Sequence, residues 1–124
     1  NGYKLFKSYG CVACHQGINF GGNMYQKFGA LQAYFAEKTE TGVDMGRFNE
    51  TSNKEDKFVF KVPSLRNVAI TAPYFHNAIT DKLPNAVEIM ALNQLGRVLP
   101  DKEKADIVSF LETLTGEVLI TPAE

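Results

Sequence analysis

Both cysteines of this 124-residue chain lie in one pentapeptide, Cys11-Val12-Ala13-Cys14-His15. Two thiols three residues apart, followed directly by an imidazole, can serve a zinc ion, a redox-active dithiol or a covalently attached porphyrin. Each kind of site requires different residues elsewhere in the sequence. The rest of the chain therefore decides what the fold is built around.

The alternatives to a porphyrin lack their other parts. A structural zinc site needs four ligands, and the only other histidine, His76, has no partner histidine nearby. A thioredoxin-like dithiol lies within a βαβ unit, and no such alternation surrounds residues 11–15. A simple disulfide would leave His15 without a role. The motif thus predicts one haem c, with thioether bonds from Cys11 and Cys14 and with His15 on one face of the iron.

Length and charge are those of a small cofactor protein. The 124 residues make one domain, 1–124, whose core a large apolar cofactor would help to complete. The net charge of −1 favours neither nucleic acid nor an anionic membrane as a partner, and no apolar run approaches the roughly 20 residues of a membrane span. Bacteria attach haem covalently outside the cytoplasm. We therefore expect a periplasmic chain, either freed of a leader or excised from a longer protein.

Hydrophobic periodicity predicts mostly helix. We expect helices over 2–9, 30–37, 84–95 and 101–114, the third opening at Pro84 and closing at Gly96. A glycine-rich loop covers 16–23, and a long charged loop, 37–57, either docks a partner or is a plain surface excursion. Residues 58–62 form the one strand-like run. The sequence predicts an all-α, cytochrome c-like bundle of three to five short helices around the haem, with little sheet.

The second axial position of the iron decides the chemistry. Methionine raises the reduction potential and suits electron transfer, a second histidine lowers it, and an open position admits peroxide or oxygen. The candidates are Met24, Met45, Met90 and His76. Met24 follows the motif too closely to cross the porphyrin, and Met45 lies in the charged loop. Met90 can approach from the side opposite His15, so it is the preferred ligand.

Three further residues have predicted roles near the haem. Lys61 and Arg66 are the expected cationic partners of its propionates, because buried carboxylates need pairing. His76 is expected to bond to the backbone at a turn, or to serve as a hydrogen-bond donor near a propionate.

Longer motifs resemble one family. The runs Phe60-Lys61-Val62-Pro63-Ser64-Leu65-Arg66-Asn67 and Thr71-Ala72-Pro73-Tyr74-Phe75-His76-Asn77 strongly resemble the carboxy-terminal haem domain of the bacterial di-haem cytochrome c peroxidases. Further matches are Gly10 to His15, Gly21-Gly22, Gly46-Arg47-Phe48, Gln94-Leu95-Gly96-Arg97, Phe110-Leu111 and Leu114-Thr115-Gly116. The similarity covers nearly the whole chain.

The resemblance implies a high-potential haem with His15 and Met90 as axial ligands. Such a domain takes electrons from a small redox protein and relays them to a second haem domain, where peroxide is reduced. It also implies a share in an interdomain calcium site through the backbone oxygens of Thr71 and Pro73, and it places His76 toward the domain interface. The sequence carries a single haem motif, so we expect electron transfer without a catalytic side chain. The alternative is a peroxidase, alone or within a longer enzyme, in which Met90 leaves the iron and His76 acts as a base.

Overall fold

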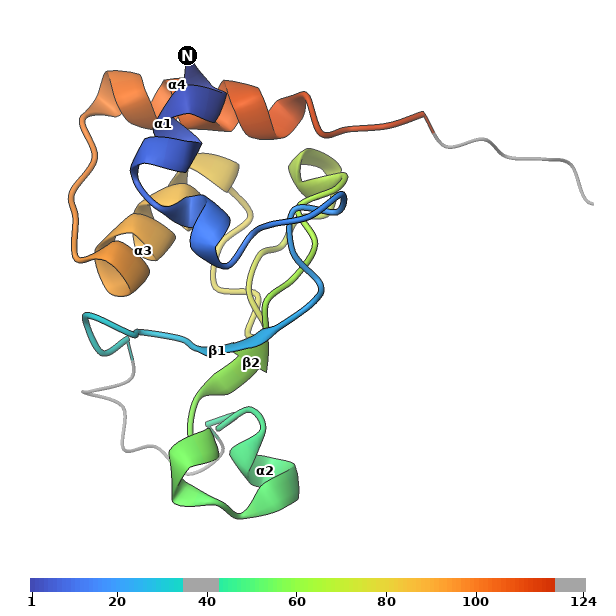
Figure 1. Cartoon of the computed structure of the whole chain (residues 1–124), viewed down its shortest axis with the longest axis vertical. Helices are drawn as coiled ribbons and strands as arrows, with labels where there is room; N and C mark the ends of the chain where they lie inside the picture. Colours follow the sequence, from blue (N-terminus) through green and yellow to red (C-terminus); the bar gives the residue numbers. More distant parts are fainter. Residues whose placement is uncertain (35–42, 118–124) are drawn as a thin grey trace, which may run out of the picture.

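The computed structural model describes residues 1–34 and 43–117, and in these ranges helices dominate (Figure 1). The α-helices are α1 (Gly2–Ser8), α2 (Phe48–Thr51), α3 (Leu83–Leu95) and α4 (Asp101–Glu112). Short 3-10 turns are η1 (Cys11–Ala13), η2 (Lys54–Asp56) and η3 (Val68–Ile70), and the strands are β1 (Tyr25–Lys27) and β2 (Val59–Lys61). The predicted helix-rich architecture with little sheet is confirmed.

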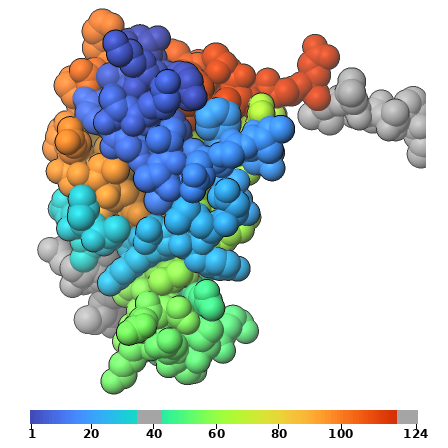
Figure 2. All heavy atoms as spheres, in the orientation of Figure 1, coloured from blue at the N-terminus to red at the C-terminus, as the bar shows by residue number. Residues whose placement is uncertain are grey.

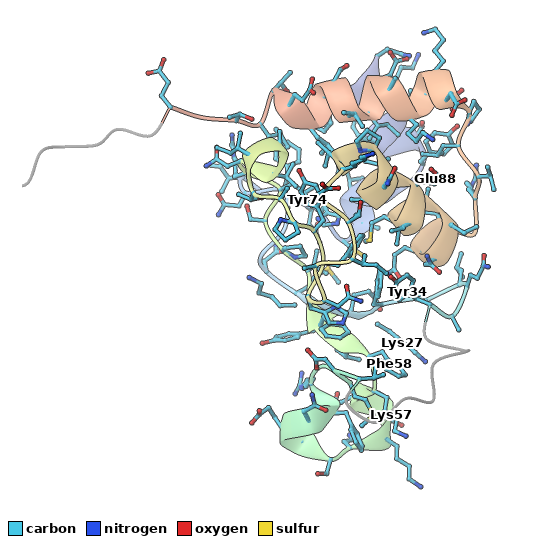
Figure 3. The ribbon with its side chains drawn as sticks, turned by 180° about the vertical axis from the view of Figure 1, so that it is seen from behind. Lys27, Tyr34, Lys57, Phe58, Tyr74 and Glu88 are labelled. Atoms are coloured by element: carbon cyan, nitrogen blue, oxygen red, sulfur yellow. The ribbon has the colours of Figure 1, made fainter. Side chains whose placement is uncertain are left out.

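The core lies where α1 crosses α4, with α3 packed beside them (Figure 1). Its buried members are Phe6, Ala91, Leu99, Ile107, Leu111 and Leu114. Polar contacts tie the same helices together at the surface. The Tyr9 hydroxyl donates to the Glu103 carboxylate. The Lys104 ammonium of α4 lies 3.2 Å from the carboxylate of Glu88, which Figure 3 labels on α3.

Helix α3 has nearly its predicted bounds, and α4 begins at the predicted Asp101 but ends at Glu112, two residues before the predicted end. Pro84 lies in the first turn of α3, and Gly96 closes the helix in a left-handed conformation with φ 62°. Helix α4 has Asp101 and Glu103 in its first turn, where carboxylates oppose the positive end of the helix dipole. Its apolar stripe supplies Ile107 and Leu111 to the core.

The helix predicted over 30–37 is wrong in its described part. Residues 30–34 form bends and irregular backbone, while 35–37 lie outside the described residues. The backbone amides of Leu31 and Gln32 both donate to the Asn93 carbonyl, at 3.1 and 3.0 Å. These tertiary bonds to the end of α3 replace the local bonds that a helix would need, so context overrides propensity here.

The charged loop is more ordered than predicted. Within the part that the structure describes, residues 43–57 contain α2 and η2, and they project beyond β2 at one end of the molecule (Figures 1 and 2). Arg47 pairs with Asp56 across this projection at 3.5 Å, and Thr51 donates a 2.7 Å hydrogen bond to the same carboxylate. Side chains on short turns thus supply order where no apolar stripe exists.

The sheet pairs the predicted strand with a short strand, β1, that follows the glycine-rich loop. Strand β2 falls inside the expected run 58–62 and pairs antiparallel with β1, with Tyr25 opposite Lys61 and Lys27 opposite Val59. The side-chain amide of Gln94 on α3 donates to the Lys27 carbonyl at 3.1 Å. The sheet is therefore fixed directly against α3.

Candidate haem-binding site

The cysteine motif forms one helical turn. Gly10 enters it with φ 92°, a left-handed conformation that favours glycine. The amides of Cys14 and His15 then both donate to the Cys11 carbonyl, at 3.3 and 2.9 Å. Positions three and four apart share a helix face, so this turn presents both thiols and the imidazole on one side. Cys11 packs against the core.

Both cysteines are free and half-buried. Burial raises the pKa of the Cys11 thiol to about 11, so this thiol is un-ionised at neutral pH. Metal binding and disulfide exchange need the thiolate. No group of three or more metal-ligating side chains occurs in the ranges 1–34 and 43–117. The arrangement therefore does not suit a zinc site or a redox dithiol in this part of the chain.

His15 is buried and oriented by the backbone. Its Nδ1 lies 3.3 Å from the Phe20 carbonyl oxygen, and because a carbonyl can only accept, Nδ1 is the protonated nitrogen. Burial lowers the pKa of His15, while hydrogen bonds to the Phe20 and Pro63 carbonyls oppose that shift. The ring is thus neutral at pH 7 with the Nε2 lone pair available, which is the form that binds iron.

Gly21 allows the chain to approach His15. A Cβ at this position would lie 2.1 Å from the Pro63 carbonyl oxygen and 3.2 Å from the His15 Nδ1. Its φ of 128° also disfavours any L side chain. The glycine-rich loop is therefore a structural part of the site, and sequence reasoning treated it only as irregular. The Gly21-Gly22 pair was the one signal that could have shown this.

The apolar surroundings fit a covalent haem. Among the described residues no large side chain is completely buried, although partly buried apolar groups, including Cys11 and Phe20, surround the core. The Phe6 ring centroid lies 6.4 Å from that of His15. A porphyrin would cover these groups, and the two free thiols and the neutral imidazole beside them are the residues that would hold it.

All three methionines are half-buried. Met90 lies on α3 beside the core residue Ala91. Met24 precedes β1, and its carbonyl accepts from the Val62 amide at 2.9 Å. Met45 accepts through its own carbonyl in the charged projection. Burial does not separate the three, and Met90 stays a prediction.

The predicted cations lie on the surface. Lys61 is exposed at the end of β2. The Arg66 guanidinium donates from Nε and Nη2 to the Ile18 carbonyl, at 3.0 and 2.8 Å. The structure thus gives Arg66 a partner in the glycine-rich loop, which sequence reasoning missed. Pairing of either cation with a propionate stays a prediction.

His76 lies in the turn between Tyr74 and Thr80, which are paired by an isolated bridge. Its exposed ring stacks on Phe60, with centroids 4.1 Å apart and an interplanar angle of 21°. Burial lowers the pKa of His76, and the nearby Asp44 carboxylate opposes the shift.

Thr71 and Pro73 come just before this turn. Both are exposed, and the Thr71 hydroxyl donates to the Val68 carbonyl at 3.3 Å. Calcium binding through their backbone oxygens stays a prediction.

This helical fold, with its Cys-x-x-Cys-His turn, defines a c-type cytochrome domain. No family model matches the chain. The chain is 46% identical to the cytochrome c551 peroxidase of Nitrosomonas europaea over an alignment of 116 residues. This alignment covers 94% of this chain and 34% of that protein. It is 45% identical to the cytochrome c peroxidase of Escherichia coli over an alignment of 115 residues, and this alignment covers 93% of this chain and 24% of that protein.

The chain is a domain related by sequence to the bacterial cytochrome c peroxidases, and the resemblance read from its motifs is confirmed. It spans about a quarter to a third of the length of these two relatives. The crystal structure of a MauG-like protein associated with microbial copper homeostasis matches with a TM-score of 0.80 at 24% identity, over 98% of this chain and 47% of that one. This match confirms the cytochrome c-like fold. None of the helices within 1–34 and 43–117 is long and apolar enough to cross a bilayer.

Proposed function

We propose that the chain is an electron-transfer domain that carries one haem c. The observation that supports this best is His15, whose Nδ1–H is held by a backbone carbonyl beside two free thiols on the same turn. When bound, the haem supplies reversible one-electron chemistry at its iron.

The residues of the chain bind and shield this group. Cys11 and Cys14 hold it covalently, and His15 offers a neutral, oriented Nε2 to the iron. Met90 would be the second protein ligand of the iron; a thioether ligand would favour the reduced state and would leave no place for peroxide. No side chain of the domain needs to move a proton. The domain therefore passes electrons and does no acid–base chemistry.

The partners follow from the relatives. Both are peroxidases and are several times longer than this chain. We place the domain in the periplasm, where a small redox protein supplies its electrons and a second haem domain receives them. Lys61 and Arg66 lie near the propionates in this arrangement, and the carbonyls of Thr71 and Pro73 contribute to calcium binding between domains.

The test is the ligand set of the oxidised protein. The proposal predicts the near-infrared sulfur-to-iron band, and Met90→Ala should abolish it, lower the reduction potential and admit cyanide. Met24→Ala and Met45→Ala are matched controls, because each removes the same side chain from a position that is half-buried, as Met90 is. A high-spin wild-type iron that binds cyanide readily would overturn the proposal, and an effect of Met45→Ala equal to that of Met90→Ala would reassign the ligand.

A second candidate function is peroxide reduction, and the state of His76 favours it. The residue is exposed, and burial of part of its ring lowers the pKa of His76, which favours the neutral imidazole that a general base requires. In that case the wild-type iron binds cyanide, and His76→Gln slows peroxide turnover while it leaves the haem spectrum unchanged. Peroxide turnover that is equal in wild type and His76→Gln would exclude a catalytic role for this histidine.

A further inference from the structure

Arg66 is fixed on the loop that surrounds His15. Its guanidinium donates two hydrogen bonds to the Ile18 carbonyl, from Nε at 3.0 Å and from Nη2 at 2.8 Å. It also lies 5.8 Å from the centroid of the Phe20 ring. Two charge-assisted bonds that converge on one oxygen fix direction as well as distance, and a lysine in this place cannot reproduce them.

The neighbours of Arg66 hold the next carbonyls of the same loop. The Ser64 hydroxyl donates to the Asn19 carbonyl at 2.7 Å. The Leu65 amide is shared between the carbonyls of Asn19 and Phe20, at 3.2 Å to each. Three consecutive residues, 64–66, thus engage three consecutive carbonyls, 18–20. We call residues 64–66 the clamp.

The clamp ends on the Phe20 carbonyl, one of the two carbonyls, with that of Pro63, that bond to the His15 ring. The Phe20 oxygen accepts from the His15 Nδ1–H at 3.3 Å. Phe20 has φ 49°, a conformation that is unfavourable for an aromatic residue and that persists only where surrounding contacts enforce it. The direction of this carbonyl therefore depends on the groups that hold the loop.

We propose that Arg66 is a positioning residue for His15: it holds the turn at residues 17–20, so that the Phe20 carbonyl fixes the His15 ring and strengthens electron donation from Nε2. This role rests on the proposed function, in which His15 binds the haem iron. It differs from the propionate pairing predicted for Arg66, because it acts through the backbone of the loop.

The two roles of Arg66 predict opposite shifts of the reduction potential. A hydrogen bond from Nδ1–H to a carbonyl raises the basicity of a metal-bound imidazole, which favours the oxidised iron, so loosening the clamp raises the potential. Removing a positive charge near the haem favours the more positive, oxidised state and lowers the potential. Arg66→Lys keeps the charge and loses the paired geometry, and Ser64→Ala loosens the clamp without any change of charge.

The experiment measures the reduction potential of the haem-loaded protein and, in its reduced state, the solvent exchange of the His15 Nδ1–H by NMR. Both Arg66→Lys and Ser64→Ala should raise the potential and speed exchange about tenfold, as expected when a hydrogen bond worth about 1.4 kcal/mol is lost. Arg47→Gln, which removes an arginine of the projection, is the control and should leave the exchange rate unchanged.

Wild-type potential and exchange in both Arg66→Lys and Ser64→Ala would overturn the positioning role. A fall in potential for Arg66→Gln, with normal exchange, would also overturn it and would assign Arg66 to a purely electrostatic role. If the wild-type Nδ1–H signal is not that of an iron-bound imidazole, the ligand assignment of the proposed function fails before any variant is compared.

Discussion

Gly2 lies where α1 crosses α4, and the crossing leaves no room for a side chain. A Cβ on Gly2 would lie 1.9 Å from the Asp106 carbonyl oxygen, 2.6 Å from its carbonyl carbon and 2.8 Å from the Phe110 Cβ. Two of these atoms belong to the backbone of α4, so no rotamer change relieves the overlap. Gly2→Ala must therefore push the two helices apart.

The size of the effect follows from two opposing terms. The Cβ falls about 1.5 Å short of ordinary contact with the carbonyl oxygen, and overpacking of this kind typically costs about 1–3 kcal/mol. Alanine regains about 0.5–1 kcal/mol as the better helix former. We expect a net loss of about 1–2 kcal/mol in the free energy of unfolding. For a domain of this size that is a fall in Tm of roughly 4–8 °C.

Thermal unfolding of the haem-loaded protein, followed by far-ultraviolet circular dichroism, measures this loss. Gly116→Ala is the matched control, since its Cβ would meet nothing closer than the Asn67 side-chain oxygen at 3.9 Å. That variant should leave Tm unchanged or raise it slightly. A Gly2→Ala protein as stable as Gly116→Ala would refute the close crossing of α1 and α4.

Three further predictions concern stability at low pH, the glycine-rich loop and the contact between the sheet and α3. The Asn1 side chain, with help from Lys102, holds the pKa of Asp106 below its usual value, so its stabilisation is present above the unfolded pKa near 3.8 and is lost as pH falls through the folded pKa. Asp106→Asn should flatten the fall of Tm with pH below about 4, and an unchanged slope would contradict this linkage. Gly21→Ala should lower the yield of haem-loaded protein sharply, because its Cβ would overlap a backbone carbonyl; a normal yield with an unshifted His15 Nδ1–H signal would contradict that. Gln94→Ala should cost about 0.5–1.5 kcal/mol in urea unfolding, since the backbone groups of Lys27, Gly29 and Ala30 lose their partner; a midpoint equal to wild type would show that this bridge adds no stability.

The sequence predicts the elements whose start and stop signals lie within their own residues. Helix α3 has a proline at its start and a glycine at its end, and α4 has an acidic first turn and a regular apolar stripe. The motif turn is fixed by its own chemistry, since thiols and imidazole must share one side. These features need no knowledge of distant residues.

The remaining features depend on contacts that sequence spacing does not reveal. Strand β1 is three residues long and exists through its pairing with β2. Helix α2 ends at Thr51, and the next residue, Ser52, is left-handed with φ 55°, so no glycine marks the turn. The Arg66 guanidinium donates to a neutral carbonyl 48 residues away in the chain, a contact that its charge alone does not indicate. In each case a tertiary contact decides between local alternatives.

The most direct test of the account is the mass of the intact chain under denaturing conditions, after expression in a bacterial periplasm that attaches haem. The account predicts the mass of the polypeptide plus one haem, retained in denaturant because Cys11 and Cys14 bind it covalently. A chain at the bare polypeptide mass, or a pigment released by denaturation, would contradict it.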